Sequence, residues 1–145
     1  MTDRLSAADL LAEREEALAD LYRTYSWRFF EHRSLWNDLR ADELIHAGWA
    51  RSLDGELGEI DLAAVVESVA CVRDAILRVR AGSVSACEAL ESALEFEKAM
   101  LAEGVFERAA RDPVSRASLK AMRSSTVEHL ERVRAAYESV ARLAS

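Results

Sequence analysis

Turn-forming residues are scarce along this chain, which has only five glycines and a single proline, Pro113, among its 145 residues. A sandwich, a barrel or an alternating α/β fold needs many turns, and strand-like alternation of apolar and polar residues is hard to find here. The chain is instead filled with Ala, Leu, Glu and Arg, which favour helices. We therefore predict an all-α fold, and the length predicts a single domain over residues 1–145.

Capping and helix-breaking residues divide the chain into five predicted helices. Serine caps are expected at Ser6, at Ser34 and at Ser83 or Ser85, and the pair Asp112 and Pro113 is typical of a helix start. The predicted ranges are residues 6–30, 34–53, 61–80, 83 or 85 to 110, and 113–143, with a loop at residues 54–58 and a stop at residues 81–82.

Four of these helices have an apolar stripe, with steps of three and four residues, that polar side chains interrupt. The interruptions are Glu15 in the first helix, Glu43 and His46 in the second, Glu97 in the fourth, and Thr126 and His129 in the fifth. Burial of an unpaired carboxylate is costly, so these residues need charged partners or a metal ion.

The interruptions also lie at matching depths. Two antiparallel helices bring residues level when these are equidistant from the connecting turn. Glu15 and His46 are centred near residues 30–31, and Glu97 and His129 are centred on Pro113. The chain thus repeats a helical hairpin, Glu…Glu-x-x-His and then Glu…Thr-x-x-His. Two such hairpins, joined by residues 61–80 as a crossover of roughly 28 Å, would place these groups in one layer of a four-helix bundle.

This pattern resembles the ferritin-like superfamily, closest in style to rubrerythrin-type and bacterioferritin-type domains. Their di-iron site uses one Glu from each of two helices and Glu-x-x-His from each of the other two. Residues 15–22 and 35–46 resemble the first half of the pattern, and residues 93–97 and 119–129 resemble the second half more loosely. The resemblance covers about residues 6–140. It implies a ferritin-like four-helix bundle of two antiparallel helical hairpins joined by a helical crossover, with the metal ligands Glu15, Glu43, His46, Glu97 and His129.

One position departs from the family pattern. Thr126 stands where the second Glu-x-x-His would place a bridging carboxylate, and threonine cannot supply one. Glu128 does not replace it, because it lies about 100° around the helix from His129. The departure implies weaker or asymmetric binding of a second metal ion, or a single ion held by Glu15, Glu43 and His46, and hence one or two ions in all.

Each candidate ligand has a simpler alternative. Glu16 would be the inward residue if the first helix were rotated by one position. Glu97 could be a surface charge, as Glu91 and Glu95 could be, although only Glu97 lies on the stripe. Glu43 and His46 could form a buried hydrogen bond without metal, and His129 could be a satisfied core histidine. Tyr22 is expected in the core, with a role beside the metal as its alternative.

Carboxylate and imidazole ligands suit iron, with manganese or zinc as alternatives. By resemblance, a complete site would oxidise ferrous iron or reduce peroxide or oxygen. Two cysteines cannot form a four-cysteine rubredoxin module, so an external electron donor is implied. The alternative function is a non-catalytic helical-bundle interaction protein with a vestigial metal site. An iron-storage cage fits less well, because the crossover is predicted as a helix.

Net charge and hydropathy argue against several classes of binding partner. A net charge of -7 without a basic run argues against nucleic acid and anionic membrane surfaces. No apolar stretch of about 18 residues occurs, which predicts no membrane span, and the acidic amphipathic start predicts a cytoplasmic protein. Trp27, Phe30 and Trp49 lie off the stripes. They could cover the crossover helix or form a subunit interface, and we expect a homo-oligomer, most simply a dimer.

Overall fold

The computed structural model describes residues 6–53, 55, 57, 60–107 and 110–143. This part of the chain contains five α-helices, two short 3-10 helices and no strand, which confirms the all-α prediction. The helices are α1 (Ala7–Arg28), η1 (Phe30–His32), α2 (Arg33–Ser52), α3 (Leu62–Arg80), α4 (Ala86–Ala102), η2 (Val105–Glu107) and α5 (Pro113–Leu143). None of the helices in these ranges has both the length and the apolarity that a membrane span requires.

Most helix starts lie where the capping residues predict them. Ser6 and Ser85 each form a capping box, in which the serine Oγ accepts a hydrogen bond at 3.1 Å from the backbone N–H three residues later. Asp61 caps α3 in the same way. Asp112 accepts a hydrogen bond from the second residue of α5, and Pro113 is the first.

Two predicted boundaries are wrong. Ser34 lies inside α2 instead of capping it, because η1 runs directly into the helix and the preceding residue, His32, makes no side-chain cap. α4 ends at Ala102 and does not continue to residue 110. Gly104 has a φ of +71°, a left-handed conformation that glycine adopts easily and that interrupts the helix. The connection to α5 is therefore a longer segment that contains η2.

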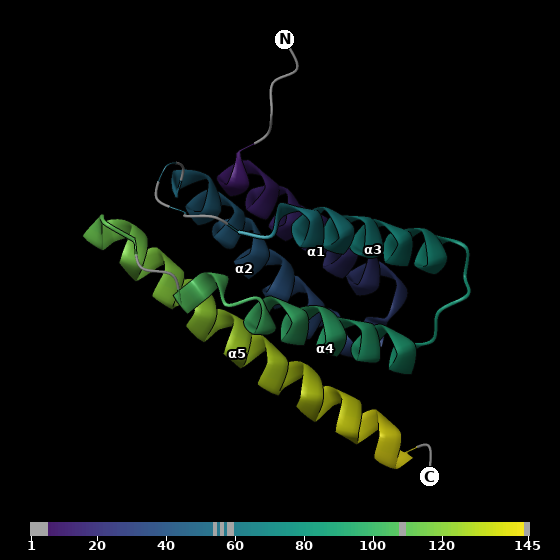
Figure 1. The fold of residues 1–145 in the computed structure, drawn as a ribbon. Coiled ribbons are helices and arrows are strands. Elements are labelled where there is room, and N and C mark those ends of the chain that lie inside the picture. The colour runs from purple at the N-terminus through teal and green to yellow at the C-terminus, as the bar shows by residue number, and fades with distance from the viewer. Residues whose placement is uncertain (1–5, 54, 56, 58–59, 108–109, 144–145) are drawn as a thin grey trace.

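The helices pack as two pairs with a fifth helix alongside. α1 packs along α2, to which η1 joins it, and α4 packs along α5, while α3 lies against α1 (Figure 1). α2 also contacts α5. α3 follows α2 and precedes α4 along the chain (Figure 1).

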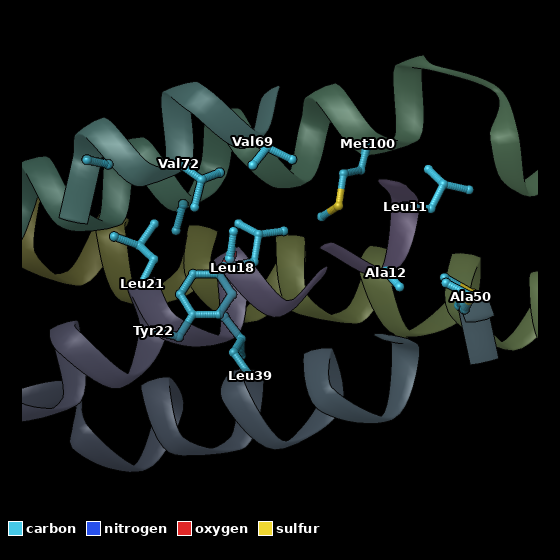
Figure 2. Close-up of a cluster of buried hydrophobic side chains, with 14 of the residues drawn as sticks. Leu11, Ala12, Leu18, Leu21, Tyr22, Leu39, Ala50, Val69, Val72 and Met100 are labelled. Carbon is cyan, nitrogen blue, oxygen red and sulfur yellow. The ribbon is translucent and has the colours of Figure 1, made fainter. Parts of the chain in front are cut away.

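α1 is the central element of the core. Figure 2 shows Val69 and Val72 of α3 facing Leu18 and Leu21 on one side of α1, with Leu39 of α2 on the other side. All five side chains are at most 5% exposed. Because neighbours cover α1 on several sides, two of its faces are buried, and polar residues on either face lose contact with water.

The aromatic residues outside the stripes have different environments. Trp27 and Phe30 are 61% and 67% exposed, each under an arginine guanidinium. Trp49 is half-buried and stacks on the ring of His46, with 5.7 Å between the ring centroids. Trp49 therefore covers one of the predicted metal ligands.

Candidate metal centre

The five predicted ligands are all buried and lie on four helices. They are Glu15 on α1, Glu43 and His46 on α2, Glu97 on α4 and His129 on α5, each at most 2% exposed. Their stripe positions account for this, since the apolar residues of each stripe carry the polar ones into the interior.

These residues form two overlapping groups. Glu15, Glu43 and His46 make one group, and Glu43, Glu97 and His129 make the other. Within each group, one ligand atom from every residue lies within 4.8 Å of the others. Glu43 belongs to both groups, so one carboxylate connects the two halves of the layer.

The neighbouring carboxylates point elsewhere. Glu16 faces outward and forms an ion pair with Arg51 at the surface. Glu91 accepts a hydrogen bond from the Tyr137 hydroxyl at 3.1 Å, and Glu95 is exposed. The helix phases that place Glu15 and Glu97 inward are therefore those expected from the stripes.

Several carboxylate oxygens and imidazole nitrogens of the layer lie close together without forming an aligned hydrogen bond. His129 Nδ1 lies 3.2 Å from Glu43 Oε1 and 3.4 Å from Glu97 Oε1, and His46 Nδ1 lies 3.3 Å from Glu43 Oε2. The buried atoms without a hydrogen-bond partner include Glu15 Oε2, both oxygens of Glu43, Glu97 Oε2 and His129 Nδ1. Buried polar atoms are rarely left unpaired in proteins, so this concentration in one layer needs an explanation.

Two further side chains hold the ligands in place. The Tyr22 hydroxyl donates a hydrogen bond of 2.8 Å to Glu97 Oε1, so Tyr22 has both a core position and a role beside the candidate ligands. His129 Nε2 lies 2.9 Å from Asp42 Oδ2. A carboxylate on the outer nitrogen of a histidine orients the ring and directs the inner nitrogen toward a metal, a common arrangement in metal sites.

Thr126 occupies the inward position that the sequence pattern assigns to it. It is 1% exposed, and its hydroxyl donates a hydrogen bond of 2.8 Å to the backbone carbonyl of Met122. Thr126 thus contributes no charge to the layer. Glu128 is exposed and supplies no replacement.

Burial and the neighbouring charges raise the pKa values of some carboxyl groups in the layer and lower that of another. Burial and the nearby Glu43 carboxylate raise the pKa of Glu97 to about 7, and the same causes raise the pKa of Glu15 well above its usual range. Burial also acts to raise the pKa of Glu43, but contacts with Glu15, His129 and His46 outweigh it and hold that pKa well below its usual range.

His129 retains its proton over a wide pH range in the absence of metal. Burial lowers its pKa, but the adjacent carboxylates of Glu43 and Glu97 outweigh burial and raise the value to about 11. In the metal-free protein, a proton on His129 thus compensates part of the negative charge. A metal ion bound there would have to replace this proton.

Arg14 is a member of the layer that the sequence predictions missed. It is 1% exposed, its Nη2 lies 3.5 Å from Glu15 Oε1, and its Nη1 pairs with Glu103. Arg14 continues a second apolar stripe of α1 through Ala17 and Leu21, which are also buried. The rule that identified Glu15, a charged residue within an apolar stripe, would have identified Arg14 on this second face.

Asp42 was missed for another reason. It is half-exposed and carries no stripe signal, and its contact with His129 joins α2 to α5. Only the packed structure brings these two residues together.

No family model, curated protein or solved structure matches this chain. The function must therefore be inferred from the site itself. Its donor atoms are carboxylate oxygens and imidazole nitrogens, a set that suits iron, manganese or zinc, and the residues present fit such an ion.

Proposed function

We propose that this chain is a ferritin-like protein that binds a divalent transition-metal ion, iron in the first place, in the layer formed by α1, α2, α4 and α5. The observation that carries the proposal is the set of buried ligand atoms from Glu15, Glu43, Glu97 and His129 that make no hydrogen bond. Without a cation, only Arg14 and a proton on His129, among the described residues, offset the three buried carboxylates, and burial of any uncompensated charge is costly.

The order of the ligands along the helices supports the ferritin-like assignment. α1 and α4 each contribute one inward glutamate, α2 contributes Glu43 and His46, and α5 contributes His129 three residues after Thr126. The pairs α1 with α2 and α4 with α5 would be the two hairpins, and α3 would be the crossover. Such an arrangement would correspond to a ferritin-like four-helix bundle with one bridging carboxylate replaced.

The donor set favours iron, with manganese or zinc as alternatives. It consists of hard carboxylates and borderline imidazoles, without a thiolate, since Cys71 is exposed and neither Cys71 nor Cys87 belongs to either group. Asp42 would fix the orientation of His129, and Tyr22 would fix the orientation of Glu97.

Bound iron would supply redox chemistry toward dioxygen or peroxide. The protein's own residues would hold the ion, exclude bulk water from it, and keep a hydroxyl, that of Tyr22, 2.8 Å from a ligand oxygen. Sustained turnover would require electrons from a separate donor, because the chain's two cysteines cannot build a four-cysteine electron-transfer site.

Metal analysis tests the proposal. The protein should be purified without air after growth with added iron and analysed for iron, manganese and zinc, with Glu97→Gln as the test variant and the exposed Glu95→Gln as its control. Wild type and Glu95→Gln should retain metal, and Glu97→Gln should lose most of it. Exposure of the iron-loaded protein to air, followed by absorbance, then tests for ferrous-iron oxidation.

Absence of metal binding would refute the proposed function. If the protein binds none of these metals and its melting temperature does not respond to them, the proposed function is wrong. The polar layer would then be a structural network in a helical interaction protein. Its oligomeric mass in solution would be the next property to measure.

A further inference from the structure

We infer that Arg14 limits this centre to a single divalent cation, held by Glu43, Glu97 and His129. The inference rests on the proposed metal-binding function and specifies how many ions the layer holds and where. Three observations carry it: the burial of Arg14, the replacement of a carboxylate by Thr126, and the unequal support of the two ligand groups.

The buried charges of the layer match one divalent cation better than two. The inward residues Glu15, Glu43 and Glu97 carry three negative charges when ionised, and Arg14 carries one positive charge that it cannot lose. One divalent cation would therefore neutralise the group. Two would leave surplus positive charge in the interior, which only an added anion such as hydroxide could offset. Glu103 also pairs with Arg14, but its side chain is 21% exposed, so it lies at the solvated edge of the layer and offsets only part of the Arg14 charge.

Arg14 lies beside one of the two ligand groups. Its Nη2 lies 3.5 Å from Glu15 Oε1, on the side of the layer that contains Glu15, Glu43 and His46. A cation bound to Glu15 would be close to a buried guanidinium, and like charges repel strongly where water is absent. Arg14 thus opposes the binding of a second metal ion at Glu15 by its charge.

The other ligand group has the better support. His129 is oriented by Asp42 at 2.9 Å, and Glu97 is held by the Tyr22 hydroxyl at 2.8 Å. His129 Nδ1 already lies within 3.4 Å of both Glu43 Oε1 and Glu97 Oε1. Preoriented ligands bind metal more tightly, so this group is the one we expect to be occupied.

Titration with manganese tests the inference without any enzymatic assay. Metal-free protein is titrated with Mn²⁺, and the signal of free Mn²⁺ in electron paramagnetic resonance gives the number of ions bound. Wild type should bind about one ion per chain with the spectrum of an isolated ion, whereas Arg14→Leu should bind a second ion at higher concentration, with spin coupling between the two. Arg51→Leu, which removes an exposed arginine paired with Glu16, should behave as wild type.

A second pair of variants tests the location of the ion even if Arg14→Leu fails to fold. Glu97→Gln should weaken Mn²⁺ binding more than about 100-fold, because loss of a ligand exceeds the loss of a supporting contact. Glu15→Gln should weaken it by less than about tenfold. Equal losses in the two variants would overturn the assigned location.

The possible failures are distinguishable. Two coupled ions in wild type, or a single ion in folded Arg14→Leu, would overturn the role of Arg14 and leave the metal-binding function standing. Absence of binding in wild type and in every variant would instead refute the proposed function itself.

Discussion

The His129 ring on α5 places its Nδ1 3.2 Å from Oε1 of Glu43 on α2, and both side chains are at most 1% exposed. This contact joins the two helix pairs at the centre of the molecule. The carboxylate also faces His46 Nδ1 at 3.3 Å, so Glu43 lies between the two imidazoles. A carboxylate in this position is either part of a buried ion-pair network with the two histidines or the shared ligand of a metal site.

Asp42→Asn should weaken metal binding by about tenfold, because an amide holds the His129 ring less firmly than a carboxylate does and no longer increases its basicity. Asp38→Asn is the matched control, since Asp38 forms a surface ion pair with Arg132 between the same two helices. Mn²⁺ titration measures both variants. Equal affinities for Asp42→Asn and Asp38→Asn would show that the contact does not orient the ligand.

Tyr22→Phe removes the hydroxyl that donates to Glu97 and leaves the rest of the aromatic packing in place. We expect metal affinity to fall by about tenfold, since Glu97 would lose the contact that orients it. Tyr25→Phe is the control, because Tyr25 is equally buried beside Trp36. If both variants bind metal as wild type does, the Tyr22 hydroxyl has only a packing role.

The metal-free protein should lose stability as pH rises from 5 to 8. The folded-state pKa of Glu97 is raised to about 7, so its contribution is complete below pH 4.5 and is lost as pH rises through 7. His129 acts in the same direction, between 6.5 and about 11, and so does Glu15, whose pKa is raised well above its usual range. Glu43, whose pKa is lowered, loses its contribution only at acidic pH.

Urea unfolding in the presence of a chelator measures this dependence. The loss attributable to Glu97 is on the order of 3 kcal/mol, since its pKa rises from 4.5 to about 7 on folding and each tenfold change in proton affinity corresponds to about 1.4 kcal/mol. Glu97→Gln should flatten the pH dependence, and the exposed control Glu95→Gln should retain it. Identical slopes in the two variants would contradict the prediction.

Thr126→Glu should restore a carboxylate at the buried position three residues before His129 on α5. Alone, it should admit a second ion only weakly, because Arg14 remains beside Glu15. Combined with Arg14→Leu, it should give two tightly bound, coupled ions. Thr126→Gln is the control, since it has the same shape without the charge. A double variant that still binds one ion would show that charge is not what limits the second site.

The stripe pattern predicted the burial of the five candidate ligands because helical periodicity alone determines which residues share a face. Glu43 and His46 lie one turn apart on α2, and both are buried as expected. The helix starts at Ser6 and Asp112 were predictable for the same local reason, since a cap bonds within its own turn.

Features that depend on packing between helices could not be predicted in this way. The contact of Asp42 with His129 requires the relative position of α2 and α5, which no local pattern encodes. The end of α4 was missed because Gly104 fits the spacing of the apolar stripe, yet its positive φ interrupts the helix. Arg14 was missed because only one face of α1 was considered, whereas α3 covers a second face.

The most direct test of the account is the metal content of wild type and Glu43→Gln, with Glu95→Gln as the surface control. Glu43 belongs to both ligand groups, so its loss should affect any ion in the layer. After anaerobic purification from iron-supplemented cells, wild type and Glu95→Gln should contain about one metal ion per chain, and Glu43→Gln should contain almost none. Metal-free wild type that cannot be loaded, or a Glu43→Gln variant that retains the wild-type metal content, would contradict the account.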